Sequence, residues 1–524
     1  MLTTINNLGG FTTSGAKIRH LSLTQQSALN ILGSVGVVLI NAAINFLLSP
    51  FIVEHLGISA NGYITLANNF VSYIALITIA LNSMSGRFIL VEYRQGNMRG
   101  ANEYYSSVLF GDWILSIVII PLMVLFVVYI DRIINIDSGG IADTRILFSI
   151  IFVNYIIQLC LPQWQTAPYC TNNLYLRSLR NIVSSIVRAL TIFLLFKFLK
   201  AHSYYVAVAA TVMSVVSISM DYWFYRLLMP NLTIRFKYFS WQKVKDLVSS
   251  GMWNTVSQCG NLLLEGLDIL ITNIFINPIS AGIMAVSKIL PNMINQLAGT
   301  MGTTFGPRLT YLFADGNRYG MAVEIKNNIK VISILVNVPI GIFAVFGQKF
   351  FSLWLPGEDS GRLWLLSNLA LSGIVFTGLG QCMINVFGAV NRLKWNSLVI
   401  IISGVISAVC VFLSLHYTNY GIYGIAGISA VISILRTLFT APYSAYCIGV
   451  PLSTFILPVL LGAVNVMLPI LISLPIVMFI SIESWWALLT AGIAVAFLSY
   501  TLDFILLLNK SQQVSFLKLL KIKK

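Results

Sequence analysis

The sequence predicts an all-α polytopic membrane protein with about 14 transmembrane helices, arranged as two six-helix lobes followed by two further helices. Of its 524 residues, 57% are hydrophobic and only 9% are charged. Soluble globular proteins carry about 25% charged residues because water must wet their surface. A chain this long and this poor in charge must have most of its surface in contact with lipid.

Apolar stretches long enough to cross a bilayer recur along the whole chain. One helical crossing of a ~30 Å hydrocarbon core needs about 20 residues. Breaks rich in polar residues, Gly or Pro delimit fourteen such stretches, at 28–51, 61–82, 106–130, 143–162, 181–199, 203–225, 249–275, 281–304, 329–347, 364–388, 395–415, 421–440, 454–479 and 485–508. None of the connections is long enough to form a separate soluble domain.

The basic residues indicate the orientation. With both termini in the cytoplasm, 24 of the 32 Lys and Arg residues lie on that side, six lie outside, and Arg188 and Lys288 lie within spans. Cytoplasmic loops retain Lys and Arg, so this four-to-one ratio predicts a multi-pass protein with both termini cytoplasmic. The net charge of +15 is therefore attributed to topology and not to nucleic-acid binding, which concentrates cations on one solvated face.

The first 27 residues lack the apolar core of a signal peptide. Lys17, Arg19 and His20 fit a cytoplasmic segment lying against anionic lipid.

An internal repeat divides the chain. A shift of 220 residues places Asn41 on Asn261, Gly62 on Gly282 and Gly86 on Gly306, and it matches the first two spans with the seventh and eighth. Because each unit holds an even number of spans, the two units have the same orientation in the membrane. The predicted divisions are a cytoplasmic segment 1–27, an N-lobe 28–245, a C-lobe 246–450, two accessory spans within 451–508 and a basic tail 509–524.

Polar residues lie on one face of each of four predicted helices. In the seventh span they occupy a stripe about 80° wide, formed by Asn254, Gln258, Asn261, Glu265, Asp268 and Thr272. The first, second and eighth spans have similar stripes, which include Asn41 and Asn45, Asn68 and Asn82, and Lys288, Asn292 and Asn295. Such faces either line a hydrated cavity between two bundles or serve ordinary helix association.

Charged residues near the middle of the membrane favour a hydrated cavity over ordinary helix association. A central charge costs about 2.5–3.5 kcal/mol even on the lenient insertion scale, and Glu265, Asp268 and Lys288 all lie there. Asp268 and Lys288 flank one turn at similar depth, so they form either a structural ion pair or part of a transport site. An unpaired Glu265 is then the stronger candidate, with Asp268, for binding a coupling cation or proton. Arg188 and Arg436 are buried cations or snorkel to the interface.

Motifs of soluble enzyme chemistry are missing from the sequence. It contains no P-loop, dinucleotide fingerprint or nucleophile elbow, and its six cysteines have no metal-ligand spacing. We expect a protein that is not an enzyme and needs no metal or cofactor.

Two short segments resemble a known family. Residues 50–63, Pro50 to Tyr63 with a Leu-Gly pair and Gly62, are similar to the first outer turn of bacterial polysaccharide flippases. Residues 83–88, with Gly86 and Arg87, resemble the end of the next span in that group. With twelve spans in two halves plus two more, the chain resembles the multidrug, oligosaccharidyl-lipid and polysaccharide (MOP) flippase superfamily, in its oligosaccharide, Wzx-like branch. Only Gly62, Gly86 and Arg87 sit on a local match.

The resemblance implies alternating access that flips an undecaprenyl-diphosphate-linked oligosaccharide, such as an O-antigen repeat of lipopolysaccharide, across the bacterial inner membrane. It also implies H⁺ or Na⁺ as coupling ion, membrane lipid, and a polysaccharide polymerase and chain-length proteins as partners. A diphosphate needs cations, for which the candidates are Lys288, Arg188, Arg87 and Arg308. Sugar hydroxyls need amides, for which the candidates are Asn41, Asn45, Asn68, Asn261, Asn292, Asn295 and Gln296. The last two spans offer an apolar groove for the lipid tail.

Two alternatives stay open. A multidrug cation antiporter of the same superfamily would favour an acidic cavity, whereas the first span has Asn41 and Asn45 and the interior has Lys288 and Arg188. A membrane glycosyltransferase or polysaccharide polymerase would need a large outer loop, and the longest here, 131–142 and 348–363, are short.

Overall fold

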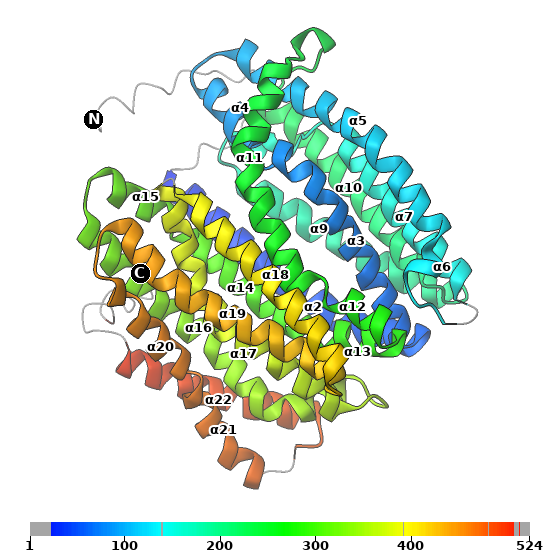
Figure 1. The fold of residues 1–524 in the computed structure, drawn as a ribbon, viewed down its shortest axis with the longest axis vertical. Coiled ribbons are helices and arrows are strands. Elements are labelled where there is room, and N and C mark those ends of the chain that lie inside the picture. Colours follow the sequence, from blue (N-terminus) through cyan, green and yellow to red (C-terminus); the bar gives the residue numbers. More distant parts are fainter. Residues whose placement is uncertain (1–22, 138–139, 391, 480–481, 508–512, 514–524) are drawn as a thin grey trace.

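The structure is a computed structural model that describes residues 23–137, 140–390, 392–479, 482–507 and 513 (Figure 1). Most of the predicted N-terminal segment, with Lys17, Arg19 and His20, and most of the basic tail lie outside the described residues. Within the described part of the chain, 12 helices are long and apolar enough to cross a membrane. The predicted all-α membrane fold is confirmed.

Among the described residues, the first lobe contains nine α-helices. They are α2 (Leu23–Leu56), α3 (Ile58–Asn82), α4 (Ser85–Arg94), α5 (Met98–Val128), α6 (Ile130–Ile133), α7 (Ile141–Cys160), α8 (Thr166–Cys170), α9 (Leu174–Phe198) and α10 (Tyr204–Leu228). Figure 1 shows this lobe in blue to green, with α4 at one end and α6 at the other.

The second lobe and the accessory helices follow. They are α11 (Trp241–Asn261), α12 (Asp268–Phe275), α13 (Pro278–Ser287), α14 (Ile289–Thr304), α15 (Gly306–Ala314), α16 (Arg318–Trp354), α17 (Ser360–Ala389), α18 (Leu393–Tyr417), α19 (Gly421–Ile448), α20 (Ile456–Val464), α21 (Met467–Phe479) and α22 (Trp485–Leu506). In Figure 1, α15 lies at the same end as α4, and α13 lies at the end of α6. We call these the α4–α15 end and the α6–α13 end.

The predicted seventh and eighth spans are broken helices, which explains why 12 and not 14 continuous helices qualify as spans. A wide turn with π-type hydrogen bonding, Leu262–Gly266, separates α11 from α12. Lys288 separates α13 from α14. Interruptions of this kind expose backbone polar groups, which are tolerated at membrane depth only where protein or a hydrated cavity surrounds them.

Helix boundaries confirm the internal repeat. The shift of 220 residues carries the first residue of α3, Ile58, onto that of α13, Pro278, and the first residue of α5, Met98, onto that of α16, Arg318. The units therefore share their element boundaries over this stretch. They differ at the two breaks, since α2 and α3 run continuously through the equivalent positions.

The turns before α5 and α16 match in detail. Gly96 and Gly316 adopt φ of 77° and 69°, a conformation that favours glycine. The next residues, Asn97 and Asn317, cap their helices by accepting a hydrogen bond from the backbone N–H three residues on, at 3.1 Å and 2.7 Å. Two separate parts of the chain thus use the same device to start a long helix.

Glycines bring the lobes together along α3. A Cβ on Gly282 of α13 would lie 2.2 Å from the carbonyl oxygen of Ile58, and one on Gly62 would lie 2.9 Å from the nitrogen of Gly282. Towards the other end of α3, a Cβ on Gly251 of α11 would lie 2.0 Å from the carbonyl oxygen of Ala80. Only glycine permits backbones to approach this closely.

Candidate functional site

A polar cavity of about 600 Å³ lies between the two lobes. Its walls come mainly from α2, α3, α9 and α10 of the first lobe and from α14 and α17 of the second. The polar lining residues are Asn45, Ser49, Asn61, Thr65, Asn68, Arg188, Asn292, Asn295, Gln296 and Gln381. Among the described residues that line it, Arg188 carries the only charge, so the cavity has a cationic and amide-rich character.

Arg188 has unused hydrogen-bonding capacity in this wall. Its Nη2 donates to Oδ1 of Asn45 at 3.3 Å, while its buried Nε has no hydrogen-bond partner among the described residues. On the opposite wall, Oδ1 of Asn295 is also buried without a partner. Unsatisfied polar atoms are costly in a low-dielectric interior, so this pair of walls is suited to a polar ligand that offers both acceptors and donors.

A smaller cavity of about 120 Å³ lies at the two helix breaks of the second lobe, where Glu265, Asp268 and Lys288 line it. Lys288 forms an ion pair with Asp268 and its Nζ donates to the carbonyl oxygen of Glu265 at 3.0 Å. The other carboxylate oxygen of Asp268 accepts a hydrogen bond from Ser429 Oγ at 3.3 Å. Asp268 is only 3% exposed. The ion pair that the sequence left as one of two alternatives for these residues is therefore present.

A second carbonyl of the wide turn, that of Gly266, accepts hydrogen bonds from side chains of the first lobe. The hydroxyl of Tyr73 donates to the carbonyl oxygen of Gly266 at 2.6 Å, and Nδ2 of Asn69 lies 3.4 Å from the same oxygen. Both donors are on α3. Sequence reasoning missed these residues, because a Tyr in an apolar helix gives no sign of a partner almost 200 positions away.

Glu265 differs from its neighbours in the small cavity. Its side chain is exposed, and no hydrogen bond or ion pair of its carboxylate is found among the described residues. The repeat shift carries the three charged residues of this cavity onto Asn45, Leu48 and Asn68, which all line the larger cavity. Part of the larger cavity's lining is thus equivalent by the repeat to the lining of the smaller cavity, and these positions are neutral in the first unit and charged in the second.

The amide candidates separate into two groups. Asn45, Asn68, Asn292, Asn295 and Gln296 line the larger cavity. Asn41 and Asn261 line none of the cavities described here. Asn261 instead accepts a hydrogen bond from Nη1 of Arg436 at 3.0 Å, which places Arg436 against α11 within the second lobe.

The two remaining cationic candidates lie at the α4–α15 end, away from both cavities. Arg87 is exposed on α4, and Arg308 on α15 pairs with Glu324 at 3.1 Å. The structure therefore does not bring Arg87 and Arg308 together with Arg188 and Lys288. Gln381 of α17 and Asn61 and Thr65 of α3 line the larger cavity without having been among the sequence candidates.

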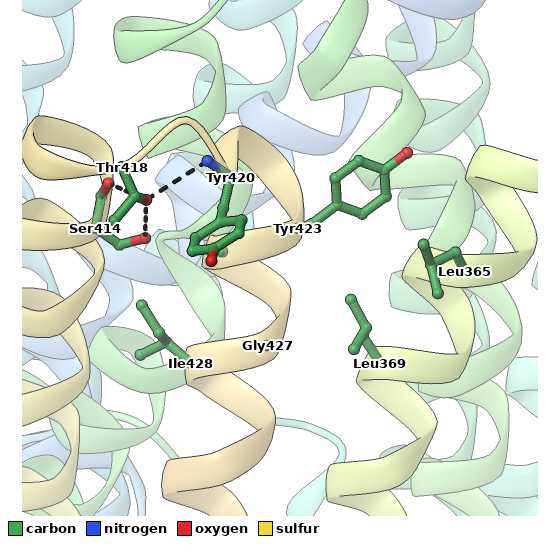
Figure 2. Close-up of a pocket in the computed structure, with 9 residues that line it drawn as sticks. Leu365, Leu369, Ser414, Thr418, Tyr420, Tyr423, Gly427 and Ile428 are labelled. Atoms are coloured by element: carbon green, nitrogen blue, oxygen red, sulfur yellow. Dashed lines mark hydrogen bonds between the residues drawn. The ribbon is translucent and has the colours of Figure 1, made fainter.

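An apolar groove of about 530 Å³ opens between α17, α18 and α19. In Figure 2, Tyr423 of α19 points towards α17, which carries Leu365 and Leu369, whereas Ile428 lies on the other side of α19, near Ser414 and Thr418. This groove belongs to the second lobe, whereas the sequence suggested a tail groove along the last two spans.

Comparison with known proteins shows which solved structures share this fold. No protein-family model matches the chain. It is similar to lipid II flippase MurJ in its inward closed conformation, with a TM-score of 0.64, 14% identity and coverage of 91% of this chain and 98% of that one. It is also similar to an inward-facing multidrug resistance MATE family transporter of the MOP superfamily, with a TM-score of 0.62, 15% identity and coverage of 81% and 98%.

The chain has a MATE/MOP-like fold. A curated relative, the uncharacterized membrane protein EpsK of Bacillus subtilis (strain 168), is 25% identical over 493 residues, 94% of this chain and 97% of that protein. The solved neighbours are a multidrug resistance transporter and a lipid II flippase, and at these low identities they show the fold alone.

Proposed function

We propose that this protein is a flippase of the oligosaccharide, Wzx-like branch. It moves a polyprenyl-diphosphate-linked oligosaccharide across the bacterial inner membrane by alternating access of an N-lobe, 28–245, and a C-lobe, 246–450. The observation that carries this proposal is the lining of the 600 Å³ cavity. It contains a half-buried arginine whose Nε lacks a partner, many amides and, among the described residues, no acid.

These groups suit the proposed cargo. A guanidinium binds phosphate oxygens through several N–H donors and keeps its charge when buried. The Arg188 Nε that lacks a partner would donate to a diphosphate oxygen. Side-chain amides both donate and accept, so Asn68, Asn292 and Gln296 would bind sugar hydroxyls. The isoprenoid tail would stay in the bilayer outside the lobes.

The second cavity would couple transport to an ion gradient. Glu265 is exposed beside the Asp268–Lys288 pair, so a proton or Na⁺ bound by Glu265 would change the net charge at the helix breaks. The wide turn that carries Glu265 also contacts α3 through Gly266, which gives the ion a physical route to the contact between lobes. The excess of cations at the α4–α15 end supports a cytoplasmic location for that end.

A substitution at Arg188 tests the cargo proposal. Arg188→Gln keeps a polar side chain but removes the charge, so we expect loss of surface glycan export with the protein still present in the membrane. Lys197→Gln on the same helix is the matched control, because Lys197 is exposed near the end of α9 and lines neither polar cavity. Export equal to wild type in Arg188→Gln would contradict the proposal.

One observation favours a second candidate, a cation antiporter of the MATE type. Glu265 offers an exposed carboxylate in the second lobe, which a cationic drug would neutralise. The larger cavity argues against this function, since its described lining repels cations through Arg188. Efflux of a cationic dye that depends on Glu265 but is unaffected by Arg188→Gln would support the antiporter.

A further inference from the structure

One hydrogen bond links the two lobes through a backbone carbonyl that a proline has freed. Pro50 lies inside α2 and has no N–H, so the carbonyl oxygen of Phe46 cannot accept the usual helical bond from position 50. Nε1 of Trp354, at the last turn of α16 in the second lobe, donates to this oxygen at 2.8 Å. Trp354 is 4% exposed, so this bond is shielded from water.

Aromatic contacts surround this bond. The ring of Phe46 stacks on Trp354 with centroids 5.7 Å apart and an interplanar angle of 15°. Phe350 of α16 lies 5.9 Å from the same ring, and Trp485 of α22 lies 5.7 Å from it in an edge-on arrangement. One residue of the first lobe is thus held by both the second lobe and an accessory helix.

A second proline provides an internal comparison. Pro291 in α14 frees the carbonyl oxygen of Ser287, which accepts a hydrogen bond from Ser367 Oγ at 2.7 Å. Both partners of that bond belong to the second lobe. At both of these prolines a neighbouring side chain replaces the missing donor, which satisfies the freed carbonyl where water is scarce. The bond at Phe46 differs because its donor comes from the other lobe.

We propose that Trp354 is a positioning residue that latches the lobes together towards the α6–α13 end. Separation of the lobes there removes the indole from the Phe46 carbonyl and leaves that oxygen without a donor, so the closed arrangement of this end is favoured. The inference rests on the alternating movement of the lobes in the proposed function, but it is independent of the cargo.

The latch predicts a specific thermodynamic pattern. Trp354→Phe keeps an aromatic ring but removes the N–H, so the free-energy difference favouring the closed end falls. Pro50→Ala returns an N–H to position 50, so Phe46 keeps a partner when the lobes separate, and the same difference falls. Both substitutions remove the same advantage of the closed arrangement, which is that the Phe46 carbonyl has a donor only there. The double variant should therefore resemble either single variant.

The test uses the full chain in nanodiscs, in a background with its six cysteines replaced. Spin labels at Glu54 of α2 and Lys349 of α16, both exposed, report the distance between the lobes. We expect Trp354→Phe and Pro50→Ala each to raise the population with a separated end by roughly two- to tenfold, the range expected for one hydrogen bond. In the double variant, Trp354→Phe should add less than a twofold change.

Trp364→Phe is the matched control, because the indole of Trp364 donates to the carbonyl oxygen of Ala344 at 3.0 Å within one lobe. It should leave the distance distribution unchanged. The proposal is overturned if Trp354→Phe leaves the distribution unchanged, or if the two latch substitutions act additively. If Trp354→Phe does not fold, Pro50→Ala still tests the proposal because it retains the indole. A larger separated population in Pro50→Ala supports the latch, and an unchanged population overturns it. A response of the distances without any transport of lipid-linked oligosaccharide would support the latch and refute the proposed function.

Discussion

Gly282→Ala is predicted to weaken the contact between the lobes at the α6–α13 end. The added Cβ would lie 2.2 Å from the carbonyl oxygen of Ile58 and 2.6 Å from its carbonyl carbon. Non-bonded carbon contacts are favourable only at about 3.5 Å or more, so α13 must move away from α3 by roughly 1 Å. Overpacking of this kind costs about 1–3 kcal/mol.

If the contact between Gly282 and Ile58 exists only in the closed arrangement, the substitution changes the free-energy difference between closed and separated lobes by the same amount. A difference of about 1–3 kcal/mol changes an equilibrium constant roughly 5- to 150-fold. The labels at Glu54 and Lys349 would show this as a larger population with separated lobes. Gly299→Ala is the control, since a Cβ on Gly299 of α14 meets nothing within 4 Å.

An unchanged distance distribution in Gly282→Ala, in protein as stable as wild type, would refute the reasoning. It would mean that the helices adjust without cost or that the contact persists in every conformation. A shift of equal size in Gly299→Ala would also refute it, because substitution of glycine in a helix would then explain the effect.

Three further predictions concern the charged helix breaks. Lys288→Met should destabilise the protein by about 3–5 kcal/mol because it leaves Asp268 buried without its cation. In thermal unfolding, a variant with the charges at 268 and 288 exchanged should recover much of this loss. No recovery would count against a structural pair. Glu265→Gln should alter the dependence of transport on the Na⁺ or proton gradient, and a wild-type gradient response would remove Glu265 from coupling. Tyr73→Phe should speed amide hydrogen exchange of residues 262–266, since the Gly266 carbonyl loses its 2.6 Å bond; unchanged exchange would show that this bond does not hold the turn.

Composition and spacing were sufficient for the fold class and the repeat. Scarcity of charge predicts the membrane fold, and the match of Gly62 with Gly282 is explained by their contact in space. The shift also brings Gly96 onto Gly316 and Asn97 onto Asn317, residues whose identical turn became recognisable only from their dihedral angles and caps.

The hydrophobic periodicity of the sequence could not predict the helix breaks. Leu262, Leu263 and Leu264 continue an apolar helical pattern, yet the backbone widens there. The turn is stabilised by donors that are distant in the sequence, Lys288 and Tyr73. A hydrophobic pattern records which face is buried and contains no information about such partners.

The polar stripes predicted faces that avoid lipid, but not the use of each amide. Asn45 and Asn292 line the larger cavity, whereas Asn261 binds Arg436 and Nδ2 of Asn254 donates to Ser83 at 3.3 Å. Helix association and cavity lining both require polar groups on an inner face. Only the packing of the lobes separates these two uses.

Reconstitution of the purified chain in liposomes is the most direct measurement of the proposed function. A fluorescent polyprenyl-diphosphate-linked oligosaccharide would be placed in both leaflets, and a membrane-impermeant quencher would report how fast labelled lipid reaches the outer leaflet. The proposal predicts rapid crossing with wild-type protein, none with Arg188→Gln and no transport of a cationic dye. Dye transport without oligosaccharide crossing would contradict it.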